Sequence, residues 1–198
     1  MAKSVTRRDI LKTLAVAVPA GSMLGLIPLQ AAQHAHKAVK QEKAAAPAGK
    51  YTPKYFTAHQ YETLRSLCQT IIPADAEWGG AIEAGAPEFI DLITSENQDY
   101  QARLGGGLIW LDATCQQRFG KVYLQSSPQQ QKEILDLIAY RSNEATDPTL
   151  HTGVEFFSFL RKLTADGFFT SEIGITYLGY IGNEYLDEFP GCPPVPGA

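Results

Sequence analysis

The sequence predicts a mainly α protein, a single helical domain of about five or six helices that ends in a segment rich in glycine and aromatic residues. Apolar residues recur at steps of three and four in several stretches, which is the spacing of a buried helix face. Several expected helix starts carry Ser or Thr three positions before Gln or Glu, and no stretch alternates like a half-buried strand. With 198 residues, the chain has room for one ordinary domain.

Residues 1–32 have the layout of an export signal. Arg7 and Arg8 are followed by a hydrophobic pair and a lysine, and an apolar stretch then covers residues 14–29. This spacing resembles the twin-arginine signal, which is read by a receptor that exports folded proteins. The segment is therefore expected to be a twin-arginine signal peptide or a membrane anchor.

The sequence leaves open whether this leader is cut or kept. The apolar stretch is about as long as a helix that crosses a bilayer, which favours an anchor, although its Gly and Pro content lowers its hydrophobicity. No clean A-x-A cleavage site follows the stretch, and the nearest small residues are Ala31 and Ala32.

Residues 33–52 are predicted to be a flexible linker. Their composition is Ala, Lys, Gln, Gly and Pro, without periodic apolar positions. His34 and His36 lie in this segment, but two ligands in a linker are too few for a metal site. The helical subunit-interaction domain is expected to occupy residues 53–198.

The first two helices of the domain are marked by their ends. Thr57 and Gln60 have the spacing of a capping box, and Pro73 stops the first helix. Its apolar face comprises Tyr61, Leu64, Cys68, Ile71 and Ile72. The second helix is expected to start near Pro87, where the missing N–H costs nothing, and to turn Phe89, Ile90 and Ile93 inward.

The third expected helix is the longest and contains a glycine triplet. Its apolar stripe runs from Tyr100 to Phe119. Each glycine of Gly105-Gly106-Gly107 costs about 1 kcal/mol relative to Ala in a helix. The triplet therefore either breaks the helix or lets another backbone approach closely. A phosphate-binding loop is the alternative, but no strand precedes the triplet and no Gly-Lys-Ser or G-x-G-x-x-G pattern surrounds it, so packing is favoured over phosphate binding.

Two further helices complete the expected domain. Ser127, Pro128 and Gln130 mark the start of the fourth, which buries Ile134, Leu135 and Ile138. Thr152 and Glu155 have the spacing of another capping box, and Gly167 is expected to end the fifth helix. The apolar side of this helix comprises Phe156, Phe157, Leu160 and Leu163.

The last 32 residues combine glycine with aromatic side chains and do not read as a plain helix. Tyr and Phe bury a large contact area at low entropic cost and are enriched in interface cores. The candidate partner-binding residues are Phe168, Phe169, Tyr177, Tyr180, Tyr185 and Cys192. A loop-rich flap that covers the protein's own core is the alternative, and the sequence leaves both open.

Charge is divided unevenly between the two parts of the chain. The net charge is -4, but residues 1–43 hold seven Lys or Arg against two acids, and residues 44–198 hold ten against nineteen. An acidic domain lacks the clustered cations that phosphate binding needs. The charge distribution therefore argues against nucleic acid as a partner of the domain.

No catalytic, cofactor-binding or metal-binding residues are predicted. The sequence holds no covalent-haem motif, iron–sulfur cysteine cluster or zinc-protease motif. In the domain, His59 and His151 lie at expected helix caps, where a solvated histidine is more typical than a general base. The acidic loop with Asp75, Glu77 and Glu83 lacks the ligand spacing of a calcium site.

The chain has three cysteines, so at least one has no partner within it. Cys68 and Cys115 lie on apolar helix faces and either remain free or form a bridge in the core. Cys192 either pairs with another chain, remains free or pairs internally.

Short motifs are spread over nearly the whole chain. They are Thr70-Ile71-Ile72-Pro73, Gly85-Ala86, Phe89-Ile90-Asp91, Gly107-Leu108-Ile109-Trp110-Leu111-Asp112, Phe119-Gly120, Gly167-Phe168-Phe169-Thr170-Ser171, Leu178-Gly179-Tyr180-Ile181-Gly182-Asn183 and Pro190-Gly191-Cys192. Together with the leader, their order and spacing resemble the gluconate 2-dehydrogenase subunit 3 family, the small subunits of membrane-bound flavin-dependent sugar dehydrogenases.

The resemblance implies a non-catalytic subunit in a periplasmic, membrane-associated complex. In that family the large subunit contains FAD and oxidises a sugar or polyol, and a multi-haem cytochrome c with haem c passes the electrons on. The small subunit would pair with the large one and carry it through the twin-arginine translocase. A free-standing periplasmic enzyme and an unrelated membrane-tethered accessory protein are the alternatives.

Overall fold

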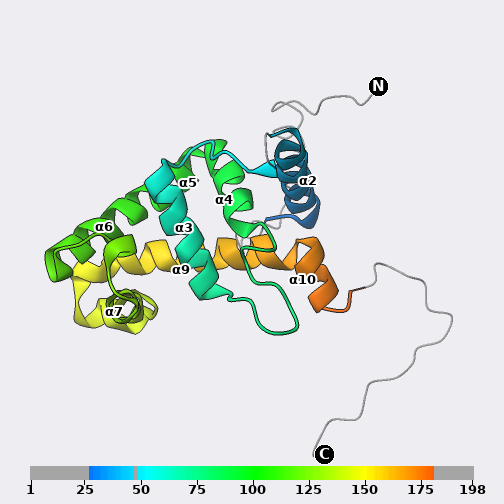
Figure 1. Cartoon of the computed structure of the whole chain (residues 1–198). Coiled ribbons are helices and arrows are strands. Elements are labelled where there is room, and N and C mark those ends of the chain that lie inside the picture. Colours follow the sequence, from blue (N-terminus) through cyan, green and yellow to red (C-terminus); the bar gives the residue numbers. More distant parts are fainter. Residues whose placement is uncertain (1–26, 47–48, 181–198) are drawn as a thin grey trace, which may run out of the picture.

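The computed structural model describes residues 27–46 and 49–180 and confirms a mainly α fold, with no β-strand in those ranges. Figure 1 shows the longest helix, α9, running through the length of the molecule with the other helices packed along it. The α-helices are α2 (Leu29–Ala45), α3 (Ala58–Ile71), α4 (Ala86–Ser95), α5 (Gln98–Tyr100), α6 (Gly106–Phe119), α7 (Pro128–Ile138), α8 (Arg141–Thr146), α9 (His151–Phe169) and α10 (Glu172–Tyr177).

Helix α9 lies at the centre of the hydrophobic core. It packs against α4 and α6, and α2 packs against α4 on the side where α10 also lies. The predicted stripe of Phe156, Phe157, Leu160 and Leu163 is buried, as periodicity requires of a central helix. In the described ranges, no helix is long and apolar enough to cross a bilayer.

Two of the three predicted capping boxes are present. Thr57 and Ser127 each accept the backbone N–H three residues on, and Gln60 and Gln130 bond back to the cap. The box predicted at Thr152 is wrong. A 3₁₀-helix, η5 (Pro148–Leu150), leads directly into α9, so the chain is already helical at His151 and Thr152 is not at the cap position.

The glycine triplet does not break its helix. A π-helix, η3 (Gln101–Gly105), joins α5 to α6 without a gap. A Cβ at Gly107 would lie 2.1 Å from the ring of Phe156, and one at Gly105 would lie 2.9 Å from the Tyr55 hydroxyl. Gly105 and Gly107 therefore permit close approach, but by aromatic side chains rather than by another backbone, and nothing lies within 4 Å of a Cβ at Gly106.

Gly167 does not end α9, contrary to the prediction. It is buried within the helix, which continues to Phe169. A Cβ at Gly167 would lie 3.0 Å from the Phe89 ring and 3.2 Å from the Ala86 Cβ. The glycine here serves the tight contact between α9 and α4 rather than a helix stop.

The flexible linker predicted for residues 33–52 is wrong over most of its length. Leu29–Ala45 form α2, whose buried residues Ala31, Ala32, Ala35 and Val39 share one face. Alanine contributes little to a hydrophobic pattern, but it allows two helices to pack closely. The folded part of the chain therefore begins well before residue 53.

A buried carboxylate fastens the segment that follows α2. Asp91 on α4 is fully buried and accepts hydrogen bonds from the Tyr51 hydroxyl at 2.9 Å and the Lys54 backbone N–H at 2.6 Å. It also accepts the backbone N–H groups of Tyr55 and Phe56, each at 3.1 Å. Several donors on one carboxylate offset the cost of burying its charge, so residues 51–56 are held firmly against α4.

Candidate interaction surface

The turn between α9 and α10 separates two neighbouring phenylalanines. The Ser171 hydroxyl donates to the Phe168 carbonyl at 2.7 Å and accepts the Gly174 N–H at 3.0 Å. A Cβ at Gly174 would lie 2.0 Å from the Phe168 carbonyl oxygen, so α10 crosses the end of α9 closely. As a result Phe168 is buried, at 4% exposed, while Phe169 is 40% exposed.

Aromatic rings gather around this turn. Tyr177 meets Trp78 edge to face at 5.7 Å between centroids, and Phe169 lies 6.4 Å from Tyr177. Leu178 and Tyr180 continue the surface and are 59% and 49% exposed. We call Trp78, Phe169, Tyr177, Leu178 and Tyr180 the aromatic end. The rings of Phe169 and Trp78 both pack on Tyr177, and Phe169 and Tyr177 keep large apolar faces in solvent.

The acidic loop positions part of this surface. Asp75 accepts the backbone N–H groups of Glu77 at 2.8 Å and Trp78 at 2.7 Å, and these hydrogen bonds lower the pKa of its carboxyl. Glu83 accepts the Gly80 N–H at 2.8 Å. Two of the three acids therefore shape the loop that presents Trp78.

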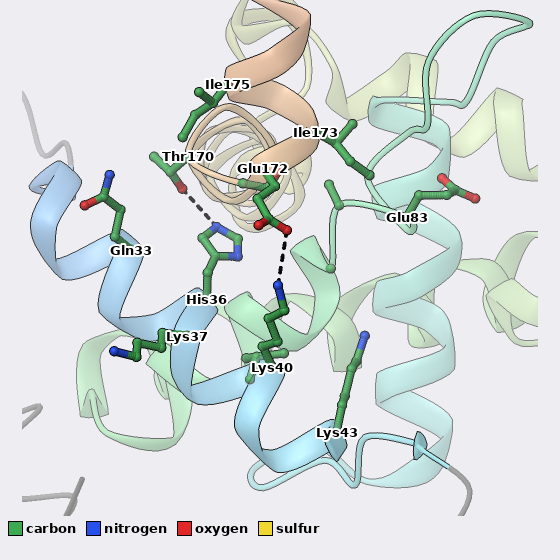
Figure 2. Close-up of a pocket in the computed structure, with 14 residues that line it drawn as sticks. Gln33, His36, Lys37, Lys40, Lys43, Glu83, Thr170, Glu172, Ile173 and Ile175 are labelled. Carbon is green, nitrogen blue, oxygen red and sulfur yellow. Dashed lines mark hydrogen bonds and ion pairs between the residues drawn. The ribbon is translucent and has the colours of Figure 1, made fainter. Parts of the chain in front are cut away.

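A pocket of about 540 Å³ lies beside the aromatic end, between α2 and α10. Figure 2 shows His36, Lys40 and Lys43 entering it from α2, and Thr170 and Glu172 from the opposite wall. Lys40 pairs with Glu172 at 3.4 Å between Nζ and Oε2.

His36 is the central polar group of this pocket. Its ring stacks on Phe89 at 4.9 Å between centroids, and its Nε2 lies 3.0 Å from the Thr170 hydroxyl. Burial lowers the pKa of the His36 ring, although a hydrogen bond to the Gly167 backbone opposes this. The His36–Thr170 contact and the Lys40–Glu172 ion pair both cross the pocket, so they join α2 to the C-terminal helices.

A family model described as gluconate 2-dehydrogenase subunit 3 matches residues 58–191, more than half of the chain. The chain belongs to this family. No curated protein and no solved structure matches it. Helix α2 and the Asp91-bound segment lie before the matched residues.

The subunit 3 family model covers most of the residues predicted for partner binding. Phe169, Tyr177 and Tyr180 are surface residues, whereas Phe168 packs inside against the other aromatic rings. Tyr185 and Cys192 lie outside the described residues, as do Arg7 and Arg8 of the leader. Trp78 and Leu178 were not predicted, although a lone tryptophan inside an acidic loop was a usable signal for Trp78.

The histidines in this subunit 3 domain each meet an acid. His59 lies in the first turn of α3, and its Nε2 is 2.6 Å from Asp112 Oδ2 on α6. Asp112 Oδ1 also accepts the Tyr123 N–H at 3.0 Å. His151 Nδ1 lies 2.5 Å from Glu144 Oε1, which raises the pKa of His151. These pairs connect neighbouring helices, and sequence reasoning did not identify either acidic partner.

The two cysteines on apolar helix faces are buried and free. The Cys68 sulfur lies 3.5 Å from the Thr164 hydroxyl, and burial raises the pKa of Cys68 to about 12. Burial also raises the pKa of Cys115 to about 11. Both are therefore protonated, unreactive core residues, and the structure has them free rather than bridged.

Proposed function

We propose that this chain is the non-catalytic small subunit of a periplasmic, membrane-associated flavoprotein dehydrogenase complex of the gluconate 2-dehydrogenase type. It pairs with the FAD-containing large subunit and escorts it through the twin-arginine translocase. The observation that carries the proposal is the exposed aromatic end on a member of the subunit 3 family.

The aromatic end has the properties of a protein contact surface. Phe169 and Tyr177 are 40% and 50% exposed, although each is large and apolar. Contiguous apolar patches on soluble proteins mark interaction sites, and aromatic residues dominate the core of such interfaces. Because the rings already pack on one another, little side-chain entropy is lost when a partner covers them.

The redox groups belong to the other subunits in this proposal. FAD is assigned to the large subunit, and haem c to the multi-haem cytochrome c subunit. The sequence of this chain has no C-x-x-C-H motif for covalent haem. This chain contributes the contact surface and the export signal.

Docking is tested with the double variant Phe169→Ala/Tyr177→Ala, co-expressed with the flavoprotein partner and purified through a tag on this chain. Loss of two interface aromatics is expected to weaken binding by about thirtyfold or more. Tyr140→Ala is the matched control, because Tyr140 is 64% exposed and lies away from the aromatic end, between α7 and α8. An intact complex with the double variant would remove the aromatic end from the interface.

Escort is tested with Arg7→Lys/Arg8→Lys in the same co-expressing cells. The expected result is that both this chain and the flavoprotein disappear from the periplasm, because the translocase receptor reads the arginine pair. Lys3→Arg is the control, because it exchanges a basic residue of the leader outside the arginine pair and should leave export unchanged. Normal periplasmic flavoprotein with the double lysine variant would contradict the escort role and leave the docking result unaffected.

A further inference from the structure

Helix α2 contains the small residues nearest to the end of the apolar leader. No clean A-x-A site follows the leader, and Ala31 and Ala32 are the nearest small residues at which a signal peptidase could cut. In the structure they lie in the first turn of α2 and are 4% and 0% exposed. A protease cuts exposed or transiently opened chain, so a buried helical site is protected as long as the helix stays docked.

The middle of α2 packs against the rest of the domain through its inner face. Ala32, Ala35 and Val39 are buried in the main core. Between them His36 stacks on Phe89 of α4 and meets the Thr170 hydroxyl after α9. Opening this helix for cleavage therefore exposes core surface and breaks polar contacts to two different parts of the domain.

Both ends of α2 are fastened as well. Lys43 Nζ lies 2.6 Å from Glu88 Oε1, and the Glu88 side chain is only 6% exposed. Just before the helix, the partly buried Ile27 side chain packs against the core. The chain is thus held from Ile27 onward, ahead of the first helical turn.

We infer that residues 27–45 remain in the exported chain as a strap across α4, and that any cut in the leader falls before Ile27. The inference rests on the proposed twin-arginine export. That route passes folded cargo, so α2 is docked before the leader meets a peptidase. Cleavage at Ala31 or Ala32 is blocked by the fold itself.

The first test determines the N-terminus of the chain recovered from the periplasmic side in its complex, by intact mass and N-terminal sequencing. The inference expects the first residue to be Ile27 or an earlier one. A chain beginning anywhere in residues 28–46, such as at Gln33, would overturn it. If no chain reaches the periplasm, the export proposal fails and the second test decides the strap.

The second test exposes the purified full-length chain to signal peptidase in detergent. In the Ala35→Asp variant a buried charge undocks α2, so cleavage within residues 28–46 should be at least about tenfold faster than in the wild type. Gln33→Asp places the same charge on the exposed face of α2 and should behave as the wild type. If the wild type and the Ala35→Asp variant are cut at equal rates, or if neither is cut, docking of α2 is not what protects the site and the inference is overturned.

Discussion

Helices α2 and α10 face each other across one pocket, yet they leave different surfaces to solvent. Helix α2 hides a face of small apolar residues and is fastened by ion pairs. Helix α10 is set by the Ser171 turn and the close crossing at Gly174, and it leaves Tyr177 half exposed. The comparison shows that α2 buries its apolar surface within the fold, whereas α10 leaves apolar surface exposed, where the proposed partner would bind.

The largest expected effect is a difference in stability between alanine variants of Phe168 and Phe169, the two neighbouring phenylalanines at the end of α9. Phe168→Ala should lower the free energy of unfolding by about 3–5 kcal/mol, because it empties a buried site. Phe169→Ala should cost less than about 1 kcal/mol, since its ring is 40% exposed. Urea denaturation of both variants measures the difference, and equal losses would mean that Phe169 is a core residue.

The next effect concerns the two lysine ion pairs of α2. Lys43→Ala should cost about 2 kcal/mol, because it leaves the buried Glu88 carboxylate without the cation that faces it. Lys40→Ala should cost no more than about 0.5 kcal/mol, because Lys40 and Glu172 are 76% and 89% exposed. Thermal unfolding of the two variants at one ionic strength compares them, and a larger loss for Lys40→Ala would contradict this assignment.

The smallest effect is the pH dependence of α2 docking through His36. Burial lowers the pKa of this ring in the folded chain, so folding favours the neutral form. Its contribution to stability is full above about pH 6.5 and is lost as pH falls from there through the lower folded pKa. Lys37, Lys40 and Glu172 line the same pocket as His36.

His36→Phe keeps a ring to stack on Phe89 but removes the titration. Between pH 8 and pH 5 the wild type should lose more stability than this variant, measured by urea denaturation at each pH. Parallel losses in the two proteins would show that another group controls the pH response of the region.

Sequence patterns predicted the elements whose signals are local. Thr57 and Ser127 begin helices because capping depends on residues three positions apart, and the stripe of α9 depends on one strong apolar period. Helix α2 was missed because Ala32 and Ala35 carry little hydrophobic signal until α4 packs on them. Gly167 was misread because its role is a contact with Phe89 in another helix.

The candidate surface was predicted only in part, for a related reason. Aromatic density marked the region, but composition does not tell which ring points inward. Phe168 and Phe169 differ by one position, about 100° around a helix, and the turn at Ser171 decides which is covered. Trp78 joins them from a distant loop, a proximity that only the folded chain creates.

The hydrogen bonds of Asp91 limit which fragments of this domain can be expected to fold. The protein donors to its carboxylate lie within residues 51–56, just before the family match at residue 58. A fragment trimmed to residues 58–191 would keep the buried charge and discard these donors, at a cost of about 3–5 kcal/mol. A fragment that folds faithfully therefore has to include Tyr51, and the packing of α2 against α4 moves its start further, to near Ile27.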